Sequence, residues 1–309
     1  MSVSLESPHT KLTITPHTIQ RAKEGLSDAQ NPQIKKAIQQ GLNDLETIAE
    51  GTFQRPIDGN FRHFILRSLI HSLFRVKVDY PELIPRSPVI LVANHLNHID
   101  PFLLLSESSA SPYFHILGDA RTLYNKWWKR FILGLSGGVI PLERRWGQET
   151  AIIEAAEGEH PELKPLAQAI AENVPSGESI KTLRQINKAV EVILAQKQGL
   201  MLFPEGRLGA TEGKLSLPLK RGTAIYALRS GVPVVPVGLV GTKNLYYRKT
   251  LTVRFGEPLS FPQVKHPKRQ DIDNVLESLE NALVELLPSH YQEPDELKLF
   301  SGFLNHFFC

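Results

Sequence analysis

Short apolar runs alternate with helical segments through the centre and the C-terminal half of the chain. Continuous apolar runs of strand length occupy residues 89–93, 200–203 and 232–239. Between the runs lie segments with apolar residues at helical spacing, such as 179–198, which Gly199 follows. Strands that are apolar throughout and are joined by helices are typical of a parallel sheet that is covered on both faces. The pattern predicts an α/β fold with a mainly parallel sheet flanked by helices.

The chain before the first apolar run has a helical pattern. Residues 16–50 indicate two helices with a break at Asn31-Pro32, and residues 61–78 indicate a third. We therefore expect an N-terminal helical region over residues 1–80 and an α/β domain over residues 81–309. A polar segment rich in Glu, Pro and Gly, residues 146–178, is expected to be an insertion in that domain.

The third predicted helix has two unlike faces. Apolar residues fall at helical spacing on one face, and basic residues recur every fourth position on another. The apolar set is Phe61, Phe64, Ile65, Leu69, Leu73 and Phe74, and the basic set is Arg67, His71 and Arg75. Such a helix can settle at a bilayer interface, or it can pack on the main domain with its charges in water. The sequence leaves both alternatives open.

Composition and charge exclude several classes of protein. The 309 residues are 41% hydrophobic and 22% charged with a net charge of +3, which is an ordinary globular balance without a nucleic-acid-binding module. One cysteine, Cys309, excludes a disulfide framework and fits a reducing compartment. The chain shows no signal-peptide pattern and no apolar run long enough to span a membrane. We expect a cytoplasmic protein that associates peripherally with a membrane.

The apolar run at 89–93 ends in a polar turn that contains candidate chemistry. His95 stands in this turn, and Asp100 follows five residues later. A histidine acts as a general base when a carboxylate holds its other ring nitrogen, so His95 is a candidate base and Asp100 its orienting partner. Alternatively, Asp100 caps a helix that begins at Pro101, or His95, His98 and Asp100 bind a metal. We expect no metal, because no second group of ligands at metal-binding spacing accompanies them.

Cations occur in three further turns. Arg144 follows an extended segment, Arg207 closes a turn after the run at 200–203, and Lys220 precedes a helix. Arginine clamps phosphate with two N–H groups. Beside Arg207, Glu205 offers a carboxylate and Gly206 lets the backbone approach a ligand closely. Each turn, taken singly, also fits a solvated surface turn.

Four blocks in this order resemble the glycerophospholipid acyltransferase family, which contains the 1-acylglycerol-3-phosphate acyltransferases. The likeness extends over about residues 75–260. The blocks are an NHxxxxD motif at Asn94, His95 and Asp100; a G-x-I-x-x-x-R motif at Gly138, Ile140 and Arg144; FPEGR at residues 203–207; and a proline-punctuated strand at residues 232–237. Several motifs in register are far more specific than any one of them.

The resemblance implies an enzyme that transfers a fatty acyl group from acyl-CoA or acyl carrier protein, with no other cofactor. The acceptor is a hydroxyl of a glycerol phosphate or lysophospholipid, foremost 1-acylglycerol-3-phosphate. His95 and Asp100 are the implied catalytic pair. The implied substrate-binding set is Arg144, Glu205, Gly206, Arg207 and Lys220. The alternatives are a glycerol-3-phosphate acyltransferase and a non-catalytic lipid-binding protein on the same scaffold.

A different enzyme class is suggested by residues 134–138, which match the G-x-S-x-G pattern around Ser136. In serine hydrolases this pattern lies between a strand and a helix. Here an extended segment, residues 139–141, follows it. We therefore do not expect a serine nucleophile.

Overall fold

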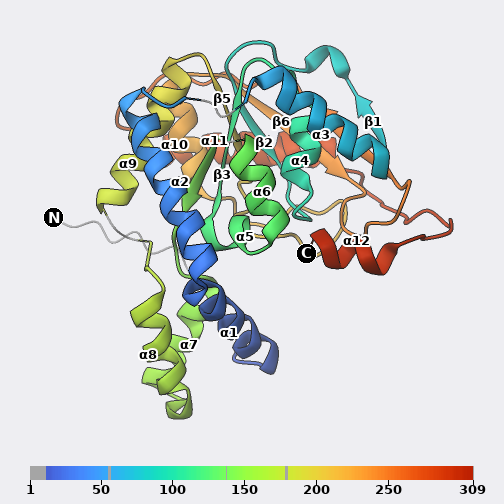
Figure 1. The fold of residues 1–309 in the computed structure, drawn as a ribbon. Helices are drawn as coiled ribbons and strands as arrows, with labels where there is room; N and C mark the ends of the chain where they lie inside the picture. Colours follow the sequence, from blue (N-terminus) through green and yellow to red (C-terminus); the bar gives the residue numbers. More distant parts are fainter. Residues whose placement is uncertain (1–11, 55–56, 137, 178–179, 309) are drawn as a thin grey trace.

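The computed structural model describes residues 12–54, 57–136, 138–177 and 180–308, and Figure 1 shows a sheet surrounded by helices. The strands are β1 (Arg75–Asp79), β2 (Ile90–Ala93), β3 (Phe114–Asp119), β4 (Val139–Leu142), β5 (Gly199–Leu202), β6 (Val234–Val240) and β7 (Thr250–Phe255). They form one sheet in the order β1-β7-β6-β2-β5-β3-β4. Every pairing is parallel except β6 with β7. The predicted α/β fold with a mainly parallel sheet is confirmed.

The helices cover both faces of this sheet. They are α1 (Pro16–Gln30), α2 (Pro32–Glu50), α3 (Gly59–Leu73), α4 (Asp100–Glu107), α5 (Ala120–Tyr124), α6 (Trp127–Ser136), α7 (Gly147–Glu157), α8 (Lys164–Asn173), α9 (Ile180–Ala195), α10 (Arg221–Ser230), α11 (Arg269–Leu286) and α12 (Ser301–Phe308), with short 3-10 turns at η1 (Pro81–Leu83) and η2 (Pro161–Leu163). Figure 1 shows α3, α4 and α6 in front of the sheet and α10 and α11 behind it.

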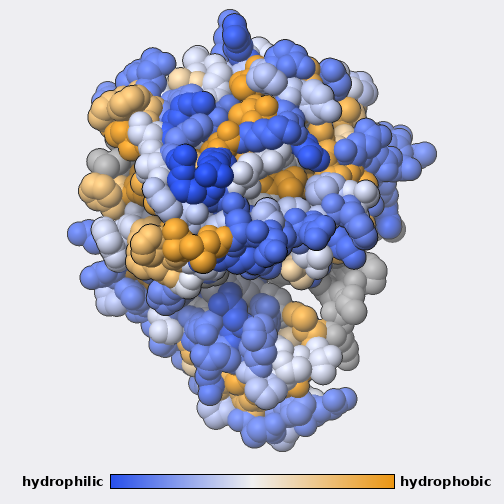
Figure 2. Space-filling view, turned by 90° about the vertical axis from the view of Figure 1, so that its right-hand side faces the viewer, coloured by the Kyte–Doolittle hydropathy of each residue, from blue (hydrophilic) through white to orange (hydrophobic). Residues whose placement is uncertain are grey.

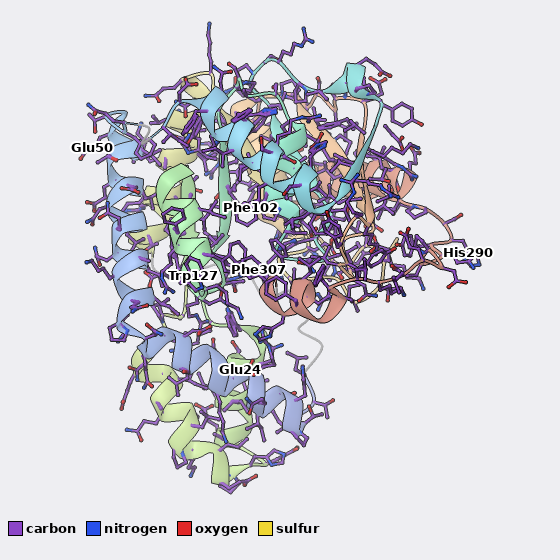
Figure 3. The ribbon with its side chains drawn as sticks, turned by 45° about the vertical axis from the view of Figure 1, so that its right-hand side comes forward. Glu24, Glu50, Phe102, Trp127, His290 and Phe307 are labelled. Carbon is purple, nitrogen blue, oxygen red and sulfur yellow. The ribbon has the colours of Figure 1, made fainter. Side chains whose placement is uncertain are left out.

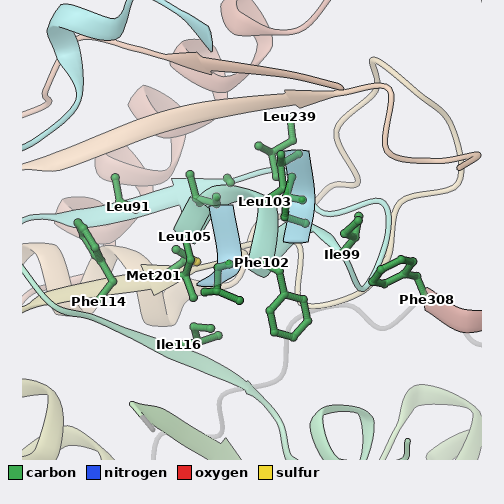
Figure 4. Packing of buried hydrophobic residues seen from close by; sticks show 14 of the residues in the cluster. Leu91, Ile99, Phe102, Leu103, Leu105, Phe114, Ile116, Met201, Leu239 and Phe308 are labelled. Carbon is green, nitrogen blue, oxygen red and sulfur yellow. The ribbon is translucent and has the colours of Figure 1, made fainter. Parts of the chain in front are cut away.

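Alternate residues of the strands separate into two cores. In β2, Leu91 and Ala93 belong to the core beneath α3, α4 and α6, whereas Ile90 and Val92 belong to the core beneath α9, α10 and α11. This division follows from the two-residue period of a strand, and it explains why β2 is apolar throughout. Figure 4 shows the first core from close by, with Phe308 of α12 beside Ile99. The C-terminal helix therefore packs next to the turn that carries His95.

The predicted break between the first two helices is confirmed, and its physical cause is visible. Asn31 caps α2, because its side chain accepts the N–H of Gln33 at 2.9 Å, and Pro32 is the first residue of that helix. Gly51 ends α2 in the left-handed region, with φ of 76°. A residue with a Cβ adopts that conformation only with strain.

The predicted helix over residues 61–78 is wrong at its C-terminal end. The helix α3 ends at Leu73, and residues Arg75–Asp79 form β1, which pairs with β7 at the edge of the sheet. In β1, Val76 and Val78 alternate with charged residues, and this two-residue period is typical of a half-buried strand. The boundary at residue 80 therefore follows a strand of the sheet.

The three N-terminal helices are present, but they pack in three different places. α2 contacts α9 and β4, α3 contacts α4, and α1 contacts α7 and α8. The helices α7 and α8 belong to the predicted insertion at 146–178. Together α1, α7 and α8 enclose a small core of their own around Ala22, Ile152 and Ile170. We call these three helices the lobe, and Figure 1 shows it below the sheet.

Candidate active site

The polar turn after β2 holds His95 against Asp100. Nδ1 of His95 lies 2.9 Å from Oδ2 of Asp100, whose side chain is fully buried. Because a carboxylate only accepts hydrogen bonds, the donor is Nδ1–H, and in the neutral ring the lone pair is then on Nε2. The same carboxylate oxygen accepts the main-chain N–H groups of Leu96 at 2.6 Å and Asn97 at 2.8 Å. The structure thus brings together the predicted base and its orienting partner.

Asp100 does not cap the helix that follows it. It is the first residue of α4, with Pro101 second, and Ile99 at the cap position makes no side-chain cap hydrogen bond. The carboxylate of Asp100 turns back to the main chain ahead of the helix. The alternative in which Asp100 serves only as a cap is therefore wrong. Its other oxygen, Oδ1, is buried and has no hydrogen-bond partner among the residues that the structure describes.

Asn94 connects this turn to β6 by two hydrogen bonds. Its side-chain amide donates to the main-chain oxygen of Leu239 at 2.9 Å, and its side-chain oxygen accepts the N–H of Leu239 at 2.7 Å. Both groups are buried. Buried hydrogen bonds of this kind are costly to break, because each partner would be left unsatisfied.

The turn after β5 is bonded to the turn after β2. The main-chain N–H of His95 donates to Oε1 of Glu205 at 2.7 Å, and the N–H of Ser216 donates to Oε2 at 2.7 Å. The ring of Phe203 stacks on the ring of His95, with centroids 4.3 Å apart. Glu205, which is buried, therefore joins the turn after β2 to the loop after β5. Its use as a substrate-binding residue stays a prediction.

Arg144 lies at the same edge of the sheet, at the carboxyl end of β4, which is separated from β5 by β3. It follows β4, and its Nη2 donates to the main-chain oxygen of Gly206 at 2.8 Å, while its Nε lies 3.7 Å from Oδ2 of Asp119. Gly206 has φ of 63°, and a Cβ at that position would meet the side chain of Lys220 at 3.0 Å. Glycine is needed there for both its conformation and the close packing of Lys220.

Arg207 and Lys220 lie on the exposed side of the same loop. Nη2 of Arg207 donates to the main-chain oxygen of Leu217 at 3.2 Å, and the N–H of Lys220 donates to the oxygen of Pro204 at 2.7 Å. Desolvation lowers the pKa of Lys220, and the charges of Arg144 and Arg207 lower that pKa further. Arg144 and Lys220 also both contact Gly206, the residue before Arg207, so the three predicted cations form one cluster.

His98 lies near His95 but is held neutral. Their ring centroids are 6.3 Å apart. Burial lowers the pKa of His98 well below the ordinary value, and the nearby charge of Lys129 acts in the same direction. Among the residues that the structure describes, no group of three His, Cys, Asp or Glu side chains is placed to hold a metal ion.

The segment that matched G-x-S-x-G has the wrong surroundings for a nucleophile. Ser136 is the last residue of α6, and β4 begins at Val139. A nucleophile elbow needs the opposite order, a strand followed by a helix. Gly137, which also belongs to the pattern, lies outside the described residues.

Two side chains at the site received no role from the sequence. They are Phe203, which stacks on His95, and Asp119, which faces Arg144. Phe203 belongs to the FPEGR block, and Asp119 is the last residue of β3. A position at the carboxyl end of a parallel strand is the signal that could have identified them.

Comparisons with known proteins identify the family of this chain. A family model described as "Acyltransferase" matches residues 75–240. A 1-acyl-sn-glycerol-3-phosphate acyltransferase of Limnanthes alba is 38% identical over 72 residues, which are 23% of this chain and 25% of that protein. The enzyme of the same name from Saccharomyces cerevisiae is 25% identical over 228 residues, 69% of this chain and 59% of that protein.

The matched segments thus span a quarter to somewhat over half of those relatives. One solved structure, the 1-acyl-sn-glycerophosphate (LPA) acyltransferase of Thermotoga maritima, aligns over 89% of each chain, with a TM-score of 0.41 and 16% identity. The family model covers the strands β1 to β6 and all four turns described above. The chain therefore belongs to the acyltransferase family.

Proposed function

We propose that the protein transfers a fatty acyl group from a thioester to a hydroxyl of a glycerol phosphate or lysophospholipid, foremost 1-acylglycerol-3-phosphate. The observation that carries the proposal is the 2.9 Å hydrogen bond between His95 Nδ1 and Asp100 Oδ2, which gives His95 the tautomer of a base. Membership of the acyltransferase family supports acyl transfer as the reaction. The names of the relatives support the acceptor.

The reaction needs no covalent enzyme intermediate. The acceptor oxygen attacks the thioester carbonyl carbon, and its proton passes to Nε2 of His95, a role worth about 10²–10⁴-fold. Asp100 stabilises the imidazolium that forms. The tetrahedral intermediate then collapses: the C–S bond breaks, and the thiolate leaves with the proton from His95. The products are an ester and a free thiol, so the atoms balance without another cofactor.

The cation cluster gives this reaction its acceptor site. Arg144, Arg207 and Lys220 surround the loop whose Glu205 holds the main chain of His95. A phosphate held by fixed cations places a neighbouring hydroxyl within reach of the base. This arrangement favours an acceptor that carries a phosphate. Acyl-CoA and acyl carrier protein both present a thioester, and we propose either as donor.

We further propose that the protein works at a membrane surface, and α3 is the main support. Arg67 and His71 of α3 are partly exposed, and both bind Glu107 of α4, which is buried. Phe64, by contrast, is 68% exposed, and Phe61, Ile65 and Leu69 are exposed with it. α3 buries Leu66 and Ile70 against the protein, yet it also exposes several large apolar side chains beside basic ones, and such a helix fits a bilayer interface. No helix in the described part of the chain is long and apolar enough to cross a membrane.

The helices α6 and α12 also carry large exposed apolar side chains. Trp127 and Phe131 of α6 and Phe300 and Phe303 at α12 are exposed large apolar side chains. Figure 3 shows Trp127 and Phe307 on the adjacent helices α6 and α12, and Trp128 stacks on Phe307. Figure 2 shows the larger apolar groups on the left-hand part of the main body. Exposed apolar area of this extent is typical of a surface that contacts a partner.

The test is a transfer assay with purified protein. Acyl-CoA and acyl carrier protein are each combined with glycerol-3-phosphate, 1-acylglycerol-3-phosphate and other lysophospholipids, and free thiol is measured. Wild type should release thiol with a phosphate-bearing acceptor, and His95→Ala should not. Release that depends on glycerol-3-phosphate alone would support the alternative acceptor. Lipid binding without thiol release for any pair would support the non-catalytic alternative and refute the enzyme.

A further inference from the structure

We propose that Arg121 is a positioning residue that holds Arg144 in place, and that the lobe exists to build this support. The inference rests on the proposed function, because it assigns a purpose to Arg144 in acceptor binding. Arg121 lies in α5, belongs to none of the four sequence blocks and is 5% exposed. A buried arginine needs acceptors for its N–H groups, and those acceptors reveal what it connects.

Arg121 is paired with a buried carboxylate of the lobe. Its Nη1 and Nη2 donate to Oε1 and Oε2 of Glu149, at 2.5 and 2.9 Å, and Glu149 is fully buried in α7. Nη1 also donates to the main-chain oxygen of Gly25 in α1 at 2.9 Å. A two-pronged pair of this kind has a fixed geometry. Arg121 therefore ties both N-terminal and inserted helices of the lobe to α5.

The remaining contact of this guanidinium runs to Arg144. Nη2 of Arg121 donates to the main-chain oxygen of Arg144 at 2.8 Å. Most N–H donors of Arg121 are thus occupied by protein acceptors, which leaves little capacity for a substrate. The contact fixes the backbone at the position from which the Arg144 side chain extends to Gly206. Arg121 consequently acts through Arg144 and does not itself hold the acceptor.

A second series of contacts connects the pair of Arg121 and Glu149 with the side chain of Arg144. The guanidinium of Arg121 lies over the ring of Trp146, 4.3 Å from its centroid, and the N–H of Trp146 donates to Glu149 at 2.6 Å. Nε1 of this held ring donates to Oδ2 of Asp119 at 3.0 Å, and that oxygen faces Nε of Arg144. The cluster around Arg121 and Glu149 therefore holds the backbone of Arg144 by a hydrogen bond and places a carboxylate 3.7 Å from its side chain.

The helix α1 packs closely against Glu149 and Trp146. A Cβ at Gly25 would collide with Oε1 of Glu149 and would lie 2.9 Å from the Trp146 ring. Gly25 thus allows α1 to pack directly on the cluster. Residues 121, 144 and 149 come from one stretch of the chain, whereas Gly25 is distant in sequence and joins them because α1 packs on α7 (Figure 1). The lobe is a support for the acceptor-binding arginine.

The experiment compares Arg121→Met, Arg121→Lys and Gly25→Ala with wild type in the transfer assay. Arg121→Met should raise the acceptor KM by about 10- to 100-fold, the effect of a misplaced positioning group, with the donor KM unchanged. Gly25→Ala should act in the same direction, and Arg121→Lys should restore part of the loss. The matched control is Arg254→Met, which also removes an arginine bonded to a carboxylate and a main-chain oxygen, but on β7.

A double-mutant cycle separates positioning from general loss of structure. In an Arg144→Ala background, Arg121→Met should cause no further rise in the acceptor KM, because its effect passes through Arg144. Additive effects, or a change confined to kcat, would overturn the inference.

Hydrogen exchange provides a readout that does not depend on turnover. Arg121→Met and Gly25→Ala should speed exchange in peptides that cover residues 139–149 and 203–209. Unchanged exchange at both segments would refute the proposed support even if the wild type shows no transferase activity. Absence of wild-type activity with altered exchange would refute the proposed function alone.

Discussion

The main-chain N–H of His95 donates to Oε1 of Glu205 at 2.7 Å, although 110 positions separate the two residues. The other carboxylate oxygen accepts the N–H of Ser216 at 2.7 Å. Glu205 therefore fixes the position of His95 relative to the loop that carries Arg207 and Lys220. Any change that weakens this hydrogen bond should alter both acceptor binding by the loop and the position of His95.

Glu205→Gln tests that bond. An amide can accept only one of the two N–H groups, so one buried donor loses its partner, at a cost of about 1–3 kcal/mol. We expect a lower free energy of unfolding in urea and a lower kcat. Glu277→Gln is a suitable control, because Glu277 is exposed on α11. A variant with wild-type stability and activity would contradict the bridging role of Glu205.

Asp100→Asn tests the orientation and charge of the catalytic pair. The amide oxygen can keep the hydrogen bonds from the turn, but the variant lacks the charge that stabilises the imidazolium. We expect kcat to fall by about 10²-fold or more, with little change in either KM. Far-ultraviolet circular dichroism should remain that of wild type. Loss of less than about twofold would argue against general-base catalysis by His95.

The lowered pKa of Lys220 predicts a pH dependence of acceptor binding. Its cause is desolvation, with the charges of Arg144 and Arg207 next. Because the neutral amine is favoured, Lys220 loses its proton at a lower pH than an ordinary lysine. Only the protonated form attracts phosphate, so the acceptor KM should rise as the pH increases through this lowered pKa. The measurement is the acceptor KM from neutral to alkaline pH.

Lys220→Met provides the comparison for that profile. It should raise the acceptor KM at neutral pH and remove the alkaline rise that Lys220 causes. Persistence of the full alkaline rise in the variant would assign it to a different group. The donor KM, measured in the same series, should show no dependence on Lys220.

The apolar surface of α3 and α12 predicts weaker membrane binding when it is made polar. Phe64→Ser and Phe303→Ser should each lower partitioning onto vesicles by about tenfold or more, since burial of a Phe side chain is worth roughly 1.5–3 kcal/mol. Co-sedimentation with vesicles of phosphatidylglycerol and phosphatidylcholine measures the bound fraction. Val284→Ser, at an exposed position of α11, is the matched control.

Transfer to a short-chain, water-soluble acceptor provides the second arm of this test. Both Phe variants should keep wild-type activity with that acceptor, because the site itself is unchanged. Equal binding of all variants to vesicles would exclude this surface as the membrane contact. A loss of activity with the soluble acceptor would instead indicate damage to the fold.

The sequence by itself determined the α/β class, most of the helices and strands, and the four turns that carry chemistry. These features depend on local periodicity and on short motifs, so they are visible without tertiary contacts. The same periodicity failed at residues 75–79, where a helical reading continued into β1. There Val76 and Val78 are held as a strand by pairing with β7, a partner far along the chain.

Only the tertiary structure decided how the site is assembled. Which face of α3 points outward depends on the core, because Leu66 and Ile70 pack into it, while Arg67 and His71 reach the buried carboxylate of Glu107. The bond from His95 to Glu205 and the pair between Arg121 and Glu149 depend on how strands and helices are ordered around the sheet. Hydrogen bonds and ion pairs between distant segments leave no periodic trace in sequence. The physical reason is that their partners become neighbours only when the chain has folded.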